Sequence, residues 1–254
     1  NNITHYDMKV EDNIINEIFK DLIKKSNYQK RKRKVIEFNK KNTILKKGIS
    51  ITPVKFGISF TTTHLNQGGA LVHIYTDGSV HLNHGGIEMG QGLMTKISQI
   101  AANELGLSTD EIKITSTDTE KVPNTSASAA SASTDINGAA VVNAINTIKN
   151  NLASFINKNF KYKGKSIKYK SNKVLFGSKS IDFKKLISLA HLNRISLSSS
   201  GFYKTPKVFR NKETLKGRPF LYFSYGAAVS EVIIDTLTGE NKLLQVDILH
   251  DVGK

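Results

Sequence analysis

Apolar residues recur at helical spacing in several stretches of the chain, and alternate with polar residues in others. The helical spacing predicts helices at about 11–26, 27–39, 93–105, 134–155 and 182–191. The alternation predicts strands at 57–61, 70–76, 79–84 and 111–117, a lysine-rich hairpin within 161–177, and a last hairpin of 221–235 and 242–249. Asp77-Gly78 joins two alternating runs, which is typical of a type I′ turn. Because strands and helices mix without regular βαβ alternation, we expect an α+β fold of mixed sheets with packed helices.

Composition narrows the chemistry that is open to the chain. The 254 residues include no cysteine, which excludes disulfides, thiolate zinc sites, a cysteine nucleophile and an iron–sulfur cluster held by this chain alone. No run of 18 apolar residues is present, so we expect no membrane partner, and the lack of cysteine fits a cytoplasmic location. The sequence starts without an initiator methionine and stops just after an apolar alternation, so we expect a piece of a longer chain.

The net charge of +16 raises the alternative of a basic nucleic-acid-binding protein. Residues 1–55 carry 14 basic and 6 acidic side chains, residues 56–148 carry 3 and 8, and residues 149–254 carry 20 and 7. The glycine- and serine-rich motifs therefore lie in the part that is acidic, which disfavours this alternative. We interpret the basic run Lys30-Arg-Lys-Arg-Lys34 as a solvated helix face.

A glycine-rich turn, Gly85-Gly-Ile-Glu-Met-Gly-Gln-Gly92, lies between a predicted strand and a predicted helix. Glycines at such a turn let backbone N–H groups approach a ligand, and a helix start adds unpaired donors. The spacing is neither a dinucleotide fingerprint nor a Walker A loop. The motif therefore predicts either a cradle for an anion or cofactor, or a tight structural turn.

A second motif, Ser126-Ala-Ser-Ala-Ala-Ser-Ala-Ser-Thr-Asp135, also leads into a helix. Ser131, Ser133 and Thr134 place hydroxyl groups near the helix start, where they can bind a ligand or cap the helix. Two such motifs in one segment predict a single polar ligand held from two sides. We interpret the histidines as surface or packing residues, because His81 and His84 are three apart on a strand and point to opposite faces.

An ordered series of motifs resembles a known family. The series comprises Gly57-Ile-Ser-Phe-Thr61, the Tyr75-Thr-Asp-Gly-Ser79 hairpin, His84-Gly-Gly-x-Glu-Met-Gly-Gln-Gly-Leu93, Ala129-Ala-Ser-x-Ser-Thr-Asp-x-x-Gly138, Gly201-Phe-Tyr-x-Thr-Pro206 and Tyr225-Gly-Ala-Ala-x-Ser-Glu-Val-x-Ile-Asp235. It is similar to the molybdenum-binding subunit or domain of the xanthine dehydrogenase/aldehyde oxidase family, and most similar to the bacterial-type xanthine dehydrogenase large subunit.

The resemblance implies an oxidoreductase with molybdopterin as its cofactor. The family hydroxylates an electron-poor carbon with oxygen from water and passes electrons to 2Fe-2S clusters and FAD, which this cysteine-free chain must leave to a partner domain or chain. We expect hypoxanthine and xanthine as substrates and a dimeric whole enzyme that binds neither nucleic acid nor membrane. An aldehyde or N-heterocycle hydroxylase of the same family is the alternative.

The resemblance also assigns residues to the site. It implies that cofactor contacts come from Met89, Gly90, Gln91, Ala129, Ala130, Ser131, Ala132 and Ser133, with the backbone of Ala130 next to molybdenum. It implies that Phe60 and Thr61 contact the substrate, through an aromatic face and a hydroxyl group.

The resemblance also implies what the chain lacks. No catalytic residue is expected here, because the family's general-base glutamate belongs to a later Gly-Glu-Pro-Pro motif, and we expect the fragment to be inactive alone. We assign residues 1–55 to the C-terminal part of the first molybdopterin-binding subdomain, and residues 56–254 to a truncated second subdomain.

Overall fold

The computed structural model describes residues 2–164 and 166–253. These residues divide into two compact units: unit 1 comprises Asn1–Ile58 and Asn211–Lys254, and unit 2 comprises Ser59–Arg210. The boundary predicted after residue 55 lies close to the first break, but residues 211–254 return to unit 1 instead of continuing the second part. The assignment of the two parts to two family subdomains stays a prediction.

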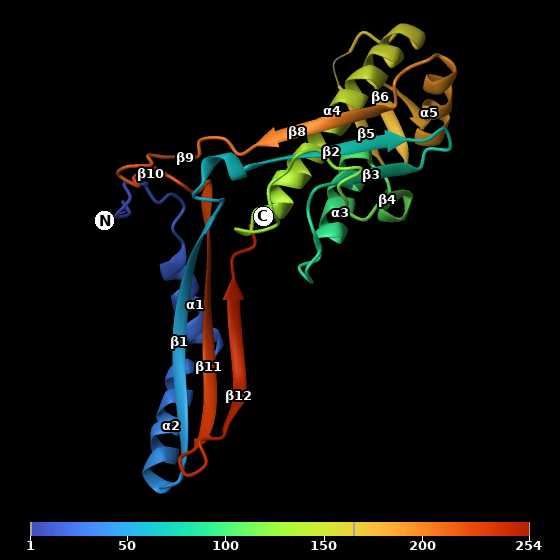
Figure 1. Ribbon diagram of the computed structural model, residues 1–254. Helices are drawn as coiled ribbons and strands as arrows, with labels where there is room; N and C mark the ends of the chain where they lie inside the picture. Colours follow the sequence, from blue (N-terminus) through green and yellow to red (C-terminus); the bar gives the residue numbers. More distant parts are fainter. Residues whose placement is uncertain (1, 165, 254) are drawn as a thin grey trace. The chain divides into compact units, whose positions relative to one another are not determined.

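Unit 1 is a three-stranded antiparallel sheet with two helices packed on it (Figure 1). Its elements are α1 (Ile15–Lys25), α2 (Tyr28–Lys41), β1 (Leu45–Ile58), β10 (Gly217–Arg218), β11 (Tyr222–Asp235) and β12 (Asn241–His250), with β11 central in the sheet. Ile18 and Leu22 of α1 are buried in a core with Tyr225, Ala227 and Val229 of β11. The alternation along β11 thus sends one set of side chains to the helices, as the sequence predicts.

The strand predicted at 57–61 is wrong in its position. The observed strand β1 runs from Leu45 to Ile58, and Pro53 lies within it opposite Ala227. Proline lacks an N–H group and is usually confined to edge strands, and β1 is an edge of this sheet. A long strand can therefore pass through Pro53 and begin well before residue 57.

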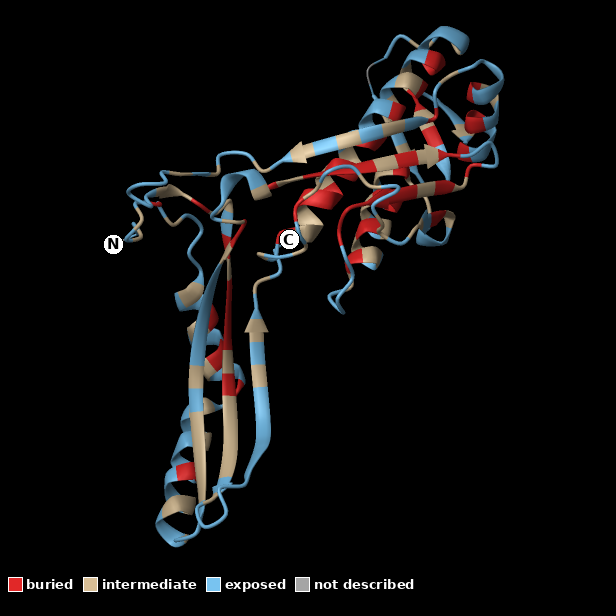
Figure 2. Ribbon diagram, in the orientation of Figure 1, coloured by how far each residue is buried: buried red, intermediate tan, exposed pale blue. Residues whose placement is uncertain are grey.

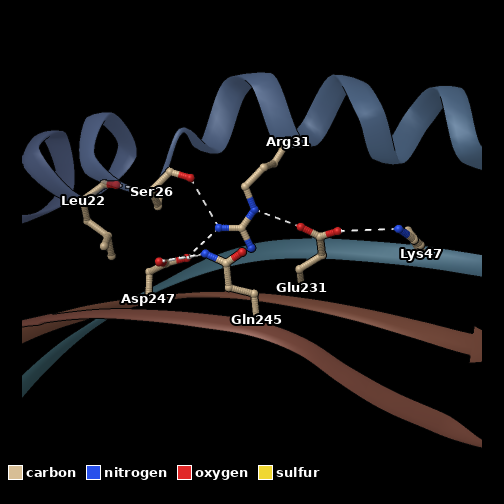
Figure 3. Close-up of polar contacts among 7 residues, drawn as sticks. All are labelled: Leu22, Ser26, Arg31, Lys47, Glu231, Gln245 and Asp247. Carbon is tan, nitrogen blue, oxygen red and sulfur yellow. Dashed lines mark hydrogen bonds and ion pairs between the residues drawn. The ribbon is translucent and has the colours of Figure 1, made fainter.

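One residue of the basic run has a structural role that the solvated-face interpretation missed. The Arg31 guanidinium lies 2.9 Å from a Glu231 oxygen and 2.6 Å from an Asp247 oxygen, and donates to the carbonyl of Ser26 (Figure 3). The three charged side chains are largely shielded from solvent. Arg31 therefore joins α2 to β11 and β12, whereas Lys30, Lys32, Arg33 and Lys34 are exposed as predicted.

Unit 2 contains a four-stranded sheet in the order β4-β3-β2-β8. Its elements are β2 (Gln67–Ile74), β3 (Val80–His84), α3 (Leu93–Leu105), β4 (Ile112–Ile114), α4 (Ser133–Asn159), β5 (Ile167–Lys170), β6 (Lys173–Phe176), β7 (Lys179–Asp182), α5 (Phe183–Leu192), β8 (Ser198–Lys204), β9 (Phe209–Arg210) and the short 3-10 turns η1 (Thr63–Leu65) and η2 (Thr109–Glu111). Helix α4 packs on β8 and β2, and α3 packs on α4. Leu82, Ile97 and Ile145 are wholly buried between these layers, where Figure 2 shows the buried residues concentrated.

The sequence predicts most of unit 2 correctly, with two corrections. The hairpin within 161–177 is confirmed by β5 and β6, although Lys165 lies outside the described residues; β7 and the length of β8 were not predicted. The turn at Asp77-Gly78 is not type I′, because Gly78 has a positive φ of 87° and Asp77 does not. The Asp77 carboxylate accepts the Ser79 N–H at 2.9 Å in this turn.

Candidate cofactor site

A pocket of about 430 Å³ lies in unit 2, at the starts of α3 and α4. We name residues 85–92 the glycine loop and residues 126–134 the serine loop. The pocket is lined by Met89, Gln91, Lys96, Ser128, Ala129, Ala130, Ser131, Ser133 and Thr134. Two motifs about 40 residues apart therefore meet at one site, and six of the eight residues predicted to contact a cofactor line it.

Direct contacts bring the two loops together. The Ile87 N–H of the glycine loop donates to the Ser128 Oγ of the serine loop at 2.7 Å. A Cβ atom on Gly86 would lie 2.6 Å from Leu93 Cδ2 and 2.8 Å from Asn137 Nδ2, closer than real Cβ contacts. Gly86 is therefore glycine because of its close neighbours and not because of its φ angle.

The glycine loop satisfies many of its own donors. The Glu88 carboxylate accepts the N–H groups of Gly90 and Gly92 at 2.9 Å and that of Met94 at 3.1 Å. These hydrogen bonds, from Met94 first, hold the pKa of the exposed Glu88 below its usual value. The start of α3 is therefore already bound to a carboxylate, and its donors are less available to a ligand than the motif alone suggests.

Gln91 lines the pocket and also stabilises its own loop. Its Oε1 accepts the Met89 N–H at 2.5 Å, and its Nε2 donates to the Ile87 carbonyl at 2.9 Å. The side chain thus fixes the conformation of the loop whose neighbouring residue, Met89, faces the pocket.

The serine loop is built differently. Ala130 and Ser131 have φ angles of 54° and 53°, a left-handed conformation that costs non-glycine residues about 1 kcal/mol each. Within the described chain, the N–H groups of these two residues have no hydrogen-bond acceptor. Helix α4 follows from Ala132 with no side-chain cap. The serine loop therefore presents unpaired backbone donors at the pocket.

Buried polar residues support both loops. His84 is fully buried, and its Nδ1 accepts the Gly86 N–H at 3.0 Å. Burial lowers the pKa of His84 to about 4, so the ring is neutral at pH 7. On the other side, the buried Asn137 donates from Nδ2 to the Ser133 carbonyl at 2.8 Å. The packing role predicted for His84 is borne out by this burial.

Four predicted site residues do not line the pocket. Gly90 has a positive φ of 98° and open space beside it, and Ala132 is buried beneath the loop. Phe60 is held in a turn by Asn66, whose Oδ1 accepts the Phe60 N–H at 2.8 Å and whose Nδ2 donates to the Phe60 carbonyl at 2.9 Å. Thr61 is exposed. The contacts expected of these four residues stay predictions.

The resemblance assigned no cofactor contact to three of the lining residues: Lys96, Ser128 and Thr134. The serine motif alone had predicted Thr134 as a possible hydroxyl ligand. Ser128 and Thr134 lie inside the serine motif, so its extent pointed to them. Lys96 lies one helical turn after Gly92, and that spacing could have placed it on the same side as the glycine loop.

The pocket fits a polar, anionic cofactor such as molybdopterin. Its lining combines unpaired N–H groups, the hydroxyl groups of Ser131, Ser133 and Thr134, and the ammonium group of Lys96, with no carboxylate. Ala129 and Ala130 contribute only small side chains to the lining, which leaves room for a large ligand. Among the described residues, no group of three or more histidine or acidic side chains could bind a metal ion directly.

Comparison with known proteins identifies the family. The molybdopterin cofactor-binding domain family matches residues 21–254, and the chain belongs to this family. The chain is 49% identical over 251 residues to xanthine dehydrogenase/oxidase of Gallus gallus and 44% identical over 254 residues to xanthine dehydrogenase of Dictyostelium discoideum. Each alignment covers 99% of this chain and 17% of the relative, so the chain spans about a sixth of the length of these relatives.

Solved structures agree on the fold. The chain superposes on the Cu,Mo-CO dehydrogenase with a TM-score of 0.81 at 20% identity, covering 97% of this chain and 32% of that one. It superposes on quinoline 2-oxidoreductase from Pseudomonas putida 86 with a TM-score of 0.81 at 17% identity, covering 99% of this chain and 32% of that one. The expected α+β fold of a molybdopterin-binding domain and the expected cofactor, molybdopterin, are confirmed.

No helix among the described residues is long and apolar enough to cross a membrane.

Proposed function

We propose that this chain is the part of a xanthine dehydrogenase-type molybdenum hydroxylase that holds molybdopterin between the glycine loop and the serine loop. The observation that carries the proposal is the single pocket lined by Met89 and Gln91 from one loop and by Ala129, Ala130 and Ser131 from the other. Two separate sequence motifs of the family are thereby joined in one donor-rich site.

In this proposal the residues of the chain bind and orient the cofactor. The unpaired N–H groups of Ala130 and Ser131 donate to its polar edge, with the Ala130 backbone next to the metal, and Gln91 keeps the opposite wall in place. The small side chains of Ala129 and Ala130 leave the space that a flat ligand requires. When bound, molybdopterin supplies the redox centre that oxidises a carbon atom with oxygen from water.

The substrate is proposed to be hypoxanthine or xanthine. Support comes from 40–49% identity to proteins named xanthine dehydrogenase, over almost all of this chain. In this proposal Phe60 packs on the flat ring of the purine and Thr61 offers a hydroxyl group beside it. The general base, the 2Fe-2S clusters and FAD are contributed by other domains or chains of a dimeric cytoplasmic enzyme, and this chain alone does not turn over.

The experiment uses the full-length protein that contains this chain. Purified enzyme is incubated with xanthine, hypoxanthine, an aromatic aldehyde and quinoline in water enriched in oxygen-18, and the products are analysed by mass spectrometry. We expect urate that carries the heavy oxygen, formed faster than the products of the other substrate classes. Faster oxidation of the aldehyde or of quinoline would replace the purine assignment, and a protein without molybdopterin would contradict the proposed function.

A further inference from the structure

Lys96 has a position in the pocket that the cofactor contacts inferred above do not explain. It lies in α3, one turn after the glycine loop, and its half-buried side chain lines the pocket that the serine loop also lines. Of the described lining residues, Lys96 alone carries a charge. Its ammonium group therefore sets the sign of the charge that the pocket favours.

Among the described lysines of unit 2, Lys149 is likewise partly shielded from solvent, and it has an acidic partner, a Glu104 oxygen at 2.6 Å. The exposed Lys184 also lies 3.1 Å from a Glu111 oxygen. No such ion pair involves Lys96 in the described part of the chain. A lysine held in a pocket wall without a carboxylate is free to pair with an anionic ligand.

The glycine loop before α3 contains one acidic residue, Glu88, and its carboxylate is already bound. Glu88 accepts three backbone N–H groups at 2.9, 2.9 and 3.1 Å, so its charge compensates the start of α3 and not the lysine. The two opposite charges near this wall thus have separate roles. Glu88 fixes the glycine loop, and Lys96 remains to balance a charge that enters with the ligand.

We propose that Lys96 binds the phosphate group of molybdopterin. This inference rests on the proposed function and adds to it the residue that recognises the anionic end of the cofactor. A lysine acts on phosphate as a point charge with three donors, so it tolerates several approach directions in an open pocket. The hydroxyl groups of Ser131 and Ser133, which line the same pocket, can donate to the same oxygens.

The test compares molybdopterin with its dephosphorylated form on the full-length apo-protein. Dissociation constants are measured by anaerobic equilibrium dialysis, with the bound pterin quantified by fluorescence after oxidation. The variants are Lys96→Met, which keeps the length of the side chain, Lys96→Arg, which keeps the charge, and the control Lys158→Met, which removes an exposed lysine at the far end of α4. Circular dichroism verifies that each variant is folded.

We expect the native protein and Lys158→Met to bind the phosphorylated form about tenfold more tightly than the dephosphorylated form. Lys96→Met is expected to bind both forms with the affinity that the native protein has for the dephosphorylated one, and Lys96→Arg to recover most of the preference. The preference of the native protein should shrink as salt is added.

Two results would overturn the inference, and they are distinguishable. If Lys96→Met keeps the full preference for the phosphorylated form, Lys96 does not bind phosphate, while the proposed function stands. If the native apo-protein binds neither form, both the inference and the proposed function fail.

Discussion

The two loops that form the pocket differ in whether their backbone N–H groups have hydrogen-bond acceptors within the chain. In the glycine loop, Glu88 and Gln91 bind the loop's own N–H groups, and glycine occupies the positions with a positive φ. In the serine loop, Ala130 and Ser131 adopt the same left-handed region without being glycine, and their N–H groups have no acceptor in the described chain.

Because of this difference, we interpret the glycine loop as a preformed wall of the pocket and the serine loop as the surface that binds the ligand. A loop that satisfies its own donors is rigid before a ligand arrives and contributes shape. A loop that holds unpaired donors in a strained conformation gains stability when a ligand accepts from them, so binding and order are coupled there. We therefore expect substitutions in the serine loop to affect cofactor affinity most strongly, and substitutions in the glycine loop to act through loop order.

The largest effect is expected from Ala130→Phe in the full-length enzyme. A phenyl ring at the pocket lining would occupy the ligand's space and increase the strain at a φ of 54°, so bound molybdenum should fall more than about a hundredfold. The measurement is metal content by mass spectrometry, with Ala127→Phe as the control, since Ala127 is an exposed loop residue outside the lining. Normal molybdenum content in Ala130→Phe would remove this residue from the site.

Acid should loosen the glycine loop through His84. Its pKa is lowered by burial from 6.5 to about 4, so the unfolded loop binds more protons between these values and the folded loop loses stability as pH falls from 6.5 to 4. The loss reaches about 3 kcal/mol at pH 4. Hydrogen exchange in peptides covering residues 80–94, corrected for intrinsic rates, should report it.

The control for this pH dependence is His84→Gln, which has no titratable ring at residue 84 and should show a much weaker pH dependence of exchange in this range, left to Glu88 at its acid end. The serine loop, residues 126–136, serves as the internal reference in both proteins. Equal acid sensitivity of the two loops in the native protein would contradict the role assigned to His84.

Gln91→Ala should have a smaller effect than Ala130→Phe. Without the hydrogen bonds to Met89 and Ile87, the glycine loop is less ordered and no longer holds its side of the pocket in place. We therefore expect bound molybdenum and turnover to fall together by about tenfold. Hydrogen exchange should rise in residues 85–92 and stay unchanged in the serine loop. Full metal loading with normal turnover would show that Gln91 is dispensable.

The smallest effect is expected from Glu88→Gln. The amide keeps one acceptor oxygen for the N–H groups of Gly90 and Gly92 but loses the charge at the start of α3. We expect about a threefold rise in exchange of the Met94 amide and unchanged metal content. A large loss of cofactor in this variant would mean that the two loops do not divide their roles as described.

Much of unit 2 was predictable from the sequence because its periodic signals are strong and local. The stripe of Leu93, Ile97 and Leu105 defines α3, and Gly106 ends it in the left-handed conformation that a C-terminal glycine favours. The meeting of the two loops was predictable from the family resemblance. From the residues alone it was a hypothesis, because no local pattern reports a contact such as that between Ile87 and Ser128.

Other features depend on partners that are distant in the sequence. The ion pairs of Arg31 with Glu231 and Asp247 join residues about 200 positions apart, so a basic run with four exposed residues gave no sign that Arg31 is paired. Likewise, the return of β11 and β12 to unit 1 depends on the pairing of β11 with β1, which lies about 180 positions earlier in the sequence. In the site, Lys96 was missed because its significance comes from the absence of a nearby carboxylate, which only the folded chain reveals.

If the glycine loop and the serine loop together hold one molybdenum cofactor, the metal must lie between them. Anomalous diffraction at the molybdenum K edge from crystals of the full-length protein tests this directly. We expect a single strong peak per active site in the pocket lined by Gln91 and Ala130, next to the Ala130 backbone. A molybdenum peak away from both loops, or cofactor density in contact with only one of them, would contradict it.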